Sequence, residues 1–318
     1  MTATAGSSSI ATRAGIDPSR PNVFIHTNHR QMVGALVGEY AMKRNSTDPD
    51  SFDVHLIRHE DYPWFADYEG KPYLRDGVSR VWHNDDLQSF TPLRFMPPEL
   101  MGYQGRAVIT DPDVFAVGDV TELLNRNMEG NKIMCRPRSG AKGFEGILAT
   151  SVMLLDCAQL GHWKVREQFD AMFRRDLDYQ DWIGLKTEDR SKLGLFEHEW
   201  NDFDRLTEKT KLIHNTKRRT QPWKSGLPAD YVPAEKWKFF PPMRWVLRAR
   251  RKFFGDYAFV PDYKSHPDQR QEAFFFGLLR ECVEKGIVSE NFLREEMGRN
   301  HVRHDAFEVL DRVQPLAA

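Results

Sequence analysis

Two aspartates with one residue between them, Asp111 and Asp113, follow the apolar run Ala107–Ile109. Alternate side chains of an extended chain point the same way, so the two carboxylates can lie side by side where a buried strand ends. A divalent cation between them would relieve their repulsion, and oxygen ligands suit Mg²⁺ and Mn²⁺. Such an ion could in turn clamp a diphosphate. The alternative is an ordinary turn, because aspartate and Pro112 both favour turns.

The first strand expected in the chain covers Asn22–Asn28 and ends in polar residues. A helix is expected over Gln31–Lys43, where apolar residues recur at helical spacing. A strand, a loop and a helix in this order open a nucleotide-binding α/β sheet, in which ligands lie beyond the carboxyl ends of the strands. His26, Thr27 and Asn28 are therefore candidate nucleotide contacts. An ordinary strand exit is the alternative, because no glycine-rich dinucleotide motif is present.

The composition is that of a globular protein. At 318 residues, of which 40% are hydrophobic, the chain can bury a substantial core. Its 45 basic and 46 acidic residues nearly cancel, which gives no overall attraction to nucleic acid or membrane. Three scattered cysteines are too few for a disulfide framework and indicate a reducing, cytoplasmic setting. No apolar run is long enough to span a bilayer, and residues 1–20 are expected to be a disordered leader.

Two further regions carry structural signals. Glu60–Arg80 is rich in aromatic and charged residues and is expected to form a long loop with short elements, as a lid over the site. The C-terminal part carries apolar residues at the three-and-four spacing of a buried helical stripe, namely Phe275, Leu278, Leu279 and Cys282. Gly286 is expected to end this helix and Ser289 to cap the next one.

The segment Gly105–Asp119, reading GRAVITDPDVFAVGD, resembles the metal-binding strand of glycosyltransferase family eight. This family includes glycogenin-like enzymes and lipopolysaccharide galactosyltransferases. In its members a strand ends in Asp-x-Asp, and a Gly-Asp pair a few residues later opens the next helix; Gly118 and Asp119 match that pair. The resemblance implies that Asp111 and Asp113 bind a divalent metal ion that holds the diphosphate of a nucleotide-sugar.

Two segments resemble parts of the family that lie near the donor sugar. Leu148–Cys157 is similar to the family's Phe-Asn-Ser-Gly-Val-Met-Leu strand, which implies that Thr150 and Ser151 face the sugar, although threonine replaces the usual asparagine. Leu87–Leu100 stands where the family has a Tyr-x-Arg segment, and Arg94 takes the place of its arginine. A fixed cation there would stabilise a diphosphate leaving group. The alternative is an arginine on a helix surface, paired with a local acid.

Asp178–Leu185 is similar to the family's Asp-Gln-Asp-x-Leu-Asn. Gln180 and Asp181 match, whereas Tyr179 replaces the first aspartate. The resemblance implies that Gln180 lies on the face where the sugar is transferred and that Asp181 orients sugar hydroxyls. A neutral amide is a poor nucleophile, which fits attack by the acceptor hydroxyl on the face that the diphosphate leaves.

Lys211–Trp223 is similar to the family's His-Phe-x-Gly-x-x-Lys-Pro-Trp. The resemblance implies that His214 completes the metal site, and an imidazole with two carboxylates is a suitable manganese set. Gln221 occupies the position of the family's lysine, which meets the diphosphate. The cation must then come from a neighbouring residue, either Lys217, Arg218, Arg219 or Lys224. Among these we expect Lys217.

A basic and aromatic stretch follows this motif. Residues 211–260 contain twelve lysines or arginines against three acids. Bases among aromatic residues suit an anionic membrane surface, a nucleic acid or an acidic glycan as partner. Alternatively, the aromatic residues pack on the catalytic domain while the bases stay solvated. The resemblance favours acceptor binding or peripheral membrane contact, through residues 236–254.

The resemblance covers roughly Val23–Lys224 and implies a GT-A fold, a mixed α/β sheet flanked by helices. It places a catalytic domain over 21–228 and a helical C-terminal extension over 229–318. It also implies a transferase that uses Mn²⁺ (or Mg²⁺) and moves a hexose from a UDP-sugar to an acceptor hydroxyl, with retention of configuration. The acceptor could be a glycan, a lipid, a small molecule, a protein or a nucleic acid. Two other interpretations stay open: a nucleotidyltransferase of related fold, and a binding protein built on a decayed transferase domain.

Overall fold

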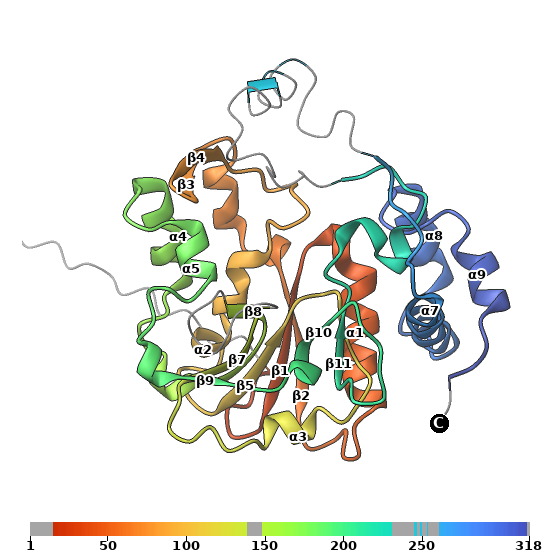
Figure 1. The fold of residues 1–318 in the computed structure, drawn as a ribbon, viewed down its shortest axis with the longest axis horizontal. Coiled ribbons are helices and arrows are strands. Elements are labelled where there is room, and N and C mark those ends of the chain that lie inside the picture. The colour runs from red at the N-terminus through yellow and green to blue at the C-terminus, as the bar shows by residue number, and fades with distance from the viewer. Residues whose placement is uncertain are drawn as a thin grey trace, which may run out of the picture.

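The computed structural model describes residues 15–138, 148–230 and 261–316, together with positions 245, 246, 249 and 253. The leader expected over residues 1–20 lies mostly outside the described residues, as does most of the stretch 236–254. A central six-stranded sheet organises the chain, in the strand order β2-β1-β5-β8-β7-β9 (Figure 1). The predicted mixed α/β sheet flanked by helices is confirmed.

The central sheet mixes parallel and antiparallel strands. β1 (Asn22–Thr27) runs parallel to β2 (Asp53–Arg58) on one side and to β5 (Arg106–Thr110) on the other. β8 (Leu148–Asp156) is antiparallel to β5. The carboxyl ends of β1 and β5 therefore share one edge of the sheet with the first half of β8. This edge is where the sequence places its polar candidate residues.

Two more strands, β7 (Ile133–Pro137) and β9 (Leu193–Leu195), complete the central sheet. A smaller three-stranded sheet consists of β6 (Val114–Ala116), β11 (Leu212–His214) and β10 (Asp202–Phe203). β11 is antiparallel to β6, with His214 opposite Val114. Since β6 follows β5 after a short turn, the small sheet carries His214 to the turn that holds the two aspartates.

Helices flank the sheet on both sides (Figure 1). On one side, α1 packs against the sheet and the three C-terminal helices lie beyond it: α1 (Met32–Arg44), α7 (Gln269–Glu284), α8 (Glu290–Gly298) and α9 (Ala306–Arg312). The remaining helices are α2 (Pro97–Leu100), α3 (Thr121–Leu124), α4 (Val165–Arg174) and α5 (Tyr179–Ile183). Among the described residues, none of these helices has the length and apolar character that a membrane span requires.

Gly34 lets α1 approach the turn that bears the aspartates. A Cβ atom at this position would lie 2.7 Å from the carbonyl oxygen of Pro112, which is closer than real side chains come. Helix α1 therefore packs directly against the turn between Asp111 and Asp113. Any side chain at position 34 would displace this turn and its two carboxylates.

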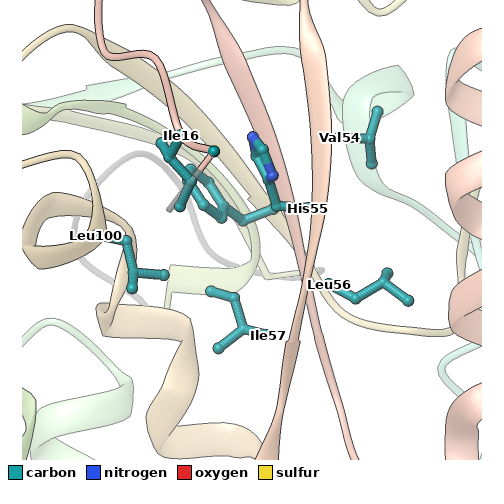
Figure 2. Close-up of a pocket in the computed structure, with 8 residues that line it drawn as sticks. Ile16, Val54, His55, Leu56, Ile57 and Leu100 are labelled. Atoms are coloured by element: carbon teal, nitrogen blue, oxygen red, sulfur yellow. The ribbon is translucent and has the colours of Figure 1, made fainter. Parts of the chain in front are cut away.

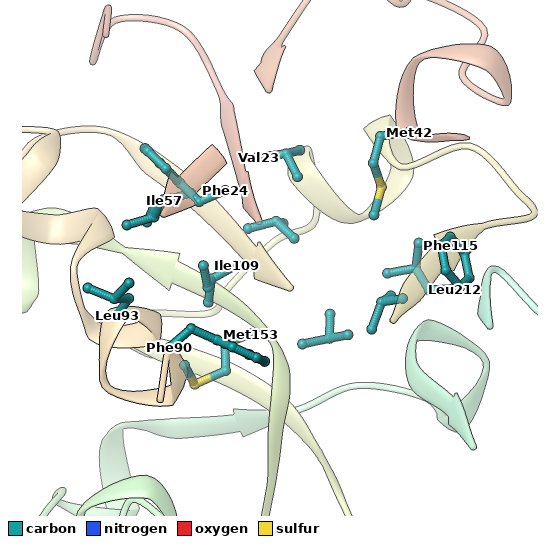
Figure 3. Close-up of a cluster of buried hydrophobic side chains, with 14 of the residues drawn as sticks. Val23, Phe24, Met42, Ile57, Phe90, Leu93, Ile109, Phe115, Met153 and Leu212 are labelled. Atoms are coloured by element: carbon teal, nitrogen blue, oxygen red, sulfur yellow. The ribbon is translucent and has the colours of Figure 1, made fainter. Parts of the chain in front are cut away.

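One apolar core packs the central sheet against α1 and the small sheet (Figure 3). Val23, Ile109 and Met153 come from the adjacent strands β1, β5 and β8, and all three are essentially inaccessible to solvent. Met42 of α1 and Leu212 of β11 belong to the same buried cluster. Each such side chain contributes about 1.5–3 kcal/mol on burial. The core therefore holds the strand ends, and with them the polar edge, in fixed positions.

The segment expected to be a long loop contains a hairpin, formed by β3 (Pro72–Arg75) and β4 (Val78–Val81). Its turn residues Asp76 and Gly77 have φ values of 54° and 69°. Positive φ at both central residues is typical of the tight turn that joins antiparallel strands, and an Asp-Gly pair favours it. Trp64 and Tyr68, just before the hairpin, pack edge-on against Phe169 of α4. The segment is thus anchored on α4.

The chain on the two sides of residues 231–260 meets at one point. Gly226 N donates to Tyr263 O at 3.0 Å. Lys224, whose side chain is fully buried, forms an ion pair with Asp230 at 2.6 Å, and the hydroxyl of Tyr263 donates to the same carboxylate. We call this meeting point, formed by Gly226, Asp230 and Tyr263, the neck.

Candidate metal centre

Asp111, Asp113 and His214 each bring one donor atom to within 4.8 Å of the others. His214 Nε2 lies 3.1 Å from Asp113 Oδ1. The imidazole is only 6% exposed, whereas the side chains of Asp111 and Asp113 are 18% and 14% exposed, so solvent reaches the two carboxylates more than the imidazole. Carboxylate oxygens with an imidazole nitrogen form a donor set that suits Mn²⁺. The residues therefore fit the divalent ion that the motifs imply.

The backbone fixes this trio from both sheets. Asp111 N donates to Ser151 O of β8 at 2.9 Å. Asp113 O accepts a hydrogen bond of 3.0 Å from the backbone N–H of Asn215, the residue after His214. The turn that carries the aspartates is thus tied to the central sheet at its start and to the small sheet at its end.

Asp111 is surrounded by cationic and polar groups. His26 Nε2 and Arg94 Nη2 each lie 2.6 Å from Asp111 Oδ1. Burial acts to raise the pKa of Asp111, but the charge of Arg94 and the hydrogen bond from His26 outweigh it and hold the pKa below its ordinary value. Asp111 therefore stays ionised and available to a cation. His26 and Arg94, expected as nucleotide and diphosphate contacts, are placed by the structure against this carboxylate.

Buried amide side chains contact the other two members of the trio, His214 and Asp113, and sequence reasoning missed both of these contacts. Asn201 Oδ1 lies 2.8 Å from His214 Nδ1, and Gln221 Nε2 donates to Asp113 Oδ2 at 3.0 Å. Burial acts to lower the pKa of His214, but the charge of Asp113 outweighs burial and raises it. Gln221 lies in the segment Lys211–Trp223 that resembles a family motif, so the sequence carried a signal for a role in the site. Asn201 lies in no such segment.

The hydroxyls of Thr150 and Ser151, expected to face the sugar, make hydrogen bonds within the protein. Thr150 Oγ1 accepts from Arg94 Nη1 at 2.6 Å and donates to the backbone oxygen of Ile183, at the end of α5, at 2.7 Å. Ser151 Oγ accepts from Asn201 Nδ2 at 3.0 Å. Thr150 therefore links Arg94 to α5, and Ser151 links β8 to the residue that holds His214.

Gln180 and Asp181 lie on α5, which Asp178 caps. The Asp178 carboxylate accepts from Gln180 N at 2.7 Å, and also from the N–H groups of Asp76 and Gly77 at the tip of the hairpin, at 3.1 and 2.8 Å. Asp181 forms an exposed ion pair of 2.5 Å with a nearby lysine. Within the described parts of the chain, no hydrogen bond joins the side chain of Gln180 or Asp181 to the metal trio. The hydrogen bonds that link α5 to the trio begin at Ile183, at the other end of this helix, and pass through Thr150 and Arg94 to Asp111.

The other candidate nucleotide contacts lie around the same edge. Thr27 Oγ1 donates to Asn28 O at 3.2 Å. The Asn28 amide donates to Ser89 Oγ at 3.1 Å and so ties the exit of β1 to the neighbouring loop. Lys217 has an exposed side chain. Lys224, in contrast, is fully buried, and this burial lowers its pKa despite its pairing at the neck.

A cavity of about 390 Å³ lies beside β1 and β2 (Figure 2). Its lining is mostly apolar and includes Ile16, Leu56 and Leu100. None of the residues that line it belongs to the metal trio or to the groups that contact the trio. The polar edge of the sheet is therefore a separate feature of the molecule.

No protein-family model and no curated protein matches the sequence. Among solved structures, the chain is similar to the galactosyltransferase LgtC in complex with donor and acceptor sugar analogs, at 13% identity and a TM-score of 0.44, over 76% of this chain and 97% of that one. It is also similar to the glycosyltransferase GlyE of Streptococcus pneumoniae TIGR4, at 13% identity and a TM-score of 0.46, over 84% of this chain and 64% of that one. A third similar structure is mouse xyloside xylosyltransferase 1 in its apo form, at 13% identity and a TM-score of 0.42, over 62% of this chain and 98% of that one.

Proposed function

We propose that the protein is a metal-dependent glycosyltransferase that moves a hexose from a UDP-sugar to an acceptor hydroxyl with retention of anomeric configuration. The observation that carries the proposal is the meeting of Asp111, Asp113 and His214 within 4.8 Å. These residues come from two sheets and meet at the edge formed by the carboxyl ends of β1 and β5. Ligands of open α/β sheets bind at such an edge.

In this proposal Asp111, Asp113 and His214 hold Mn²⁺ or Mg²⁺. When bound, the ion supplies positive charge to the diphosphate as it leaves the sugar. Arg94 and His26 serve the trio by holding Asp111 in its ionised form through contacts of 2.6 Å. The charge on Asp111 is then present before any donor arrives, so little reorganisation is needed on binding.

Groups around the trio have proposed roles toward the substrates. Gln180 and Asp181 position the sugar from α5, and the neutral amide of Gln180 leaves the acceptor hydroxyl to attack on the face that the diphosphate vacates. Lys217, with its exposed side chain, is the cation proposed to meet the diphosphate. Thr150 and Ser151 are proposed to face the donor sugar, and their hydrogen bonds to Ile183 O and from Asn201 hold them in place.

The nucleotide is proposed to lie against the exit of β1, at His26, Thr27 and Asn28. The catalytic chemistry is assigned to residues 21–228. Residues 229–318 form the proposed extension, in which the basic stretch 236–254 meets the acceptor or an anionic membrane surface.

The proposal is tested by incubating the purified protein with a panel of UDP-hexoses, with and without Mn²⁺, and measuring both UDP release and thermal stability. A matching donor is expected to stabilise the protein and to release UDP only when metal is present, because ligands that bind the folded state raise its apparent stability. Release of pyrophosphate from a nucleoside triphosphate and a sugar phosphate would instead indicate a nucleotidyltransferase. Stabilisation by a donor without any turnover would indicate a binding protein.

A further inference from the structure

Asn201 is a fully buried asparagine that contacts His214, one member of the metal trio. Its Oδ1 lies 2.8 Å from His214 Nδ1, and its Nδ2 donates to Ser151 Oγ at 3.0 Å. Because the NH₂ group is committed to Ser151, the amide oxygen faces the imidazole and accepts the Nδ1–H. When the imidazole is neutral, the other ring nitrogen, Nε2, then carries the lone pair that can bind a cation, and this nitrogen faces Asp113 Oδ1, an oxygen of another candidate ligand, at 3.1 Å.

We infer that Asn201 is the positioning residue of His214, which fixes the imidazole tautomer and the ring orientation that a bound divalent cation needs. The inference rests on the proposed metal site. It gives a role to a residue that lies outside every motif from which that site was predicted. Histidines that bind metals generally donate their second N–H to a carbonyl or carboxylate oxygen, and this partner orients the ring and strengthens the ligand. Here that partner is a neutral amide, reached at a normal hydrogen-bond distance of 2.8 Å between two buried side chains.

Ser151 connects this contact to the other half of the trio. Its hydroxyl receives the Asn201 amide at 3.0 Å, while its backbone oxygen accepts from Asp111 N at 2.9 Å. One residue of β8 thus sets both the turn that bears the aspartates and, through Asn201, the imidazole. Any tilt of Asn201 would move His214 relative to Asp111.

The backbone of residue 201 has a support that does not depend on its side chain. Arg136 Nη1 donates to Asn201 O at 2.6 Å, and the guanidinium of Arg136 lies over the ring of Phe203 at 4.1 Å. A substitution at position 201 is therefore expected to remove the hydrogen bond to His214 while the chain keeps its path.

The test measures Mn²⁺ affinity by electron paramagnetic resonance of the free ion, in the absence of any sugar, for the full chain and three variants. Asn201→Leu keeps the approximate volume but has no acceptor, and its Mn²⁺ affinity is expected to fall about 10–100-fold. Asn201→Asp keeps an acceptor oxygen and is expected to bind Mn²⁺ at least as tightly as the unmodified protein. Asn22→Leu is the matched control, since Asn22 is also fully buried but lies at the start of β1, away from the trio, and its affinity should not change.

The inference is overturned if Asn201→Leu binds Mn²⁺ as the unmodified protein does, or if Asn201→Asp loses as much affinity as Asn201→Leu. Should Asn201→Leu fail to fold, Asn201→Ser replaces it, because serine is small, polar and too short to reach His214. Unchanged affinity in that variant also overturns the inference, and a 10–100-fold loss supports it. Metal binding by the unmodified protein without any sugar transfer would refute the proposed function and leave this inference standing.

Discussion

Gln221 donates from its amide Nε2 to Asp113 Oδ2 at 3.0 Å, although 108 positions separate the two residues in the sequence. Gln221 is 1% exposed, and its amide oxygen has no hydrogen-bond partner among the described residues. The residue that occupies the place of a lysine in the resembled motif thus contacts a candidate metal ligand directly. A neutral group at this point leaves the full charge of Asp113 to the cation.

Gln221→Lys is expected to lower the affinity for Mn²⁺ by about 10-fold or more, because an ammonium group beside Asp113 competes with the metal for the carboxylate. Isothermal titration with Mn²⁺ checks this. Gln104→Lys adds the same charge at an exposed position and should leave the affinity unchanged. Equal affinities for both variants would show that a charge at position 221 does not affect metal binding by Asp113.

Asp113→Asn is expected to abolish metal-dependent turnover while the protein stays folded. The substitution replaces an anionic ligand by a neutral one. Mn²⁺ affinity should therefore fall by about 100-fold or more, since the loss of a group that only contacts a metal ligand already costs up to about 100-fold. Asp119→Asn is the control in the same segment, since Asp119 accepts from Thr121 N at 2.8 Å and does not belong to the trio. Circular dichroism and donor hydrolysis are measured together. Full activity in Asp113→Asn would refute the site.

Arg94→Lys is expected to destabilise the protein by about 1–3 kcal/mol. The guanidinium fork donates to Asp111 Oδ1 and to Thr150 Oγ1 at once, both at 2.6 Å, and a single ammonium cannot reproduce that geometry. Urea unfolding at pH 7 measures the change. Arg174→Lys, at a highly exposed ion pair with Asp176, should alter stability by less than about 0.5 kcal/mol. A similar loss in both variants would contradict the prediction.

Asp178→Ala is expected to cost about 1–2 kcal/mol, the range for loss of a helix cap. It should also release the hairpin, because the same carboxylate holds Asp76 N and Gly77 N. Faster amide hydrogen exchange at these two positions, measured by mass spectrometry, checks this. In Asp189→Ala, which removes a cap from a different turn, exchange at the hairpin should stay slow. Unchanged exchange in Asp178→Ala would mean that the hairpin is held by its aromatic contacts alone.

Glu281→Gln is expected to lower stability by about 1–2 kcal/mol at pH 7, because Arg44 donates to both carboxylate oxygens of Glu281 across the contact between α1 and α7. Burial acts to raise the pKa of Glu281, but the hydrogen bonds from Arg44 and Tyr40 lower it overall. Since the folded-state pKa is depressed, this stabilisation is fully present above pH 4.5, the ordinary value, and is lost as the pH falls through the lower folded value.

Urea unfolding of the Glu281→Gln variant and the unmodified protein at several pH values tests this dependence. The difference between the two should be constant from pH 6 to pH 7 and should shrink below about pH 4.5. Glu284→Gln, which breaks an exposed pair with Arg280 on the same helix, should cost only about 0.3–0.5 kcal/mol. A difference that grows on acidification would have the wrong sign for this ion pair.

Where the sequence carried a periodic or capping signal, its predictions agree with the structure. The strand expected over Asn22–Asn28 is β1, which ends at Thr27. Gly286, with a φ of 71°, follows the end of α7, and the Ser289 hydroxyl caps α8 by accepting from Phe292 N, as expected. These features depend on neighbours within a few residues, so local chemistry is sufficient to specify them.

At the hairpin, two signals in the sequence favoured different structures. Asp76-Gly77 between alternating residues is a hairpin signal, but the aromatic and charged residues around it, including Trp64 and Tyr68, favoured a loop. In the structure those aromatic rings pack on α4 and leave the turn chemistry to decide the local form.

Contacts between distant segments were beyond the reach of residue spacing. Asn201 meets His214 because β10 and β11 pair side by side, and no spacing in the sequence reports that pairing. The same holds for the cations near Gln221. Charge alone did not reveal that the side chain of Lys217 is exposed while that of Lys224 is completely buried.

The neck has a consequence for how this protein can diversify. Because Gly226 N donates to Tyr263 O, the chain before residue 231 and the chain after residue 260 are held together at the neck. A longer or shorter segment between these two residues would change the closure entropy only slowly. The length of this segment can therefore vary with little consequence for the central sheet.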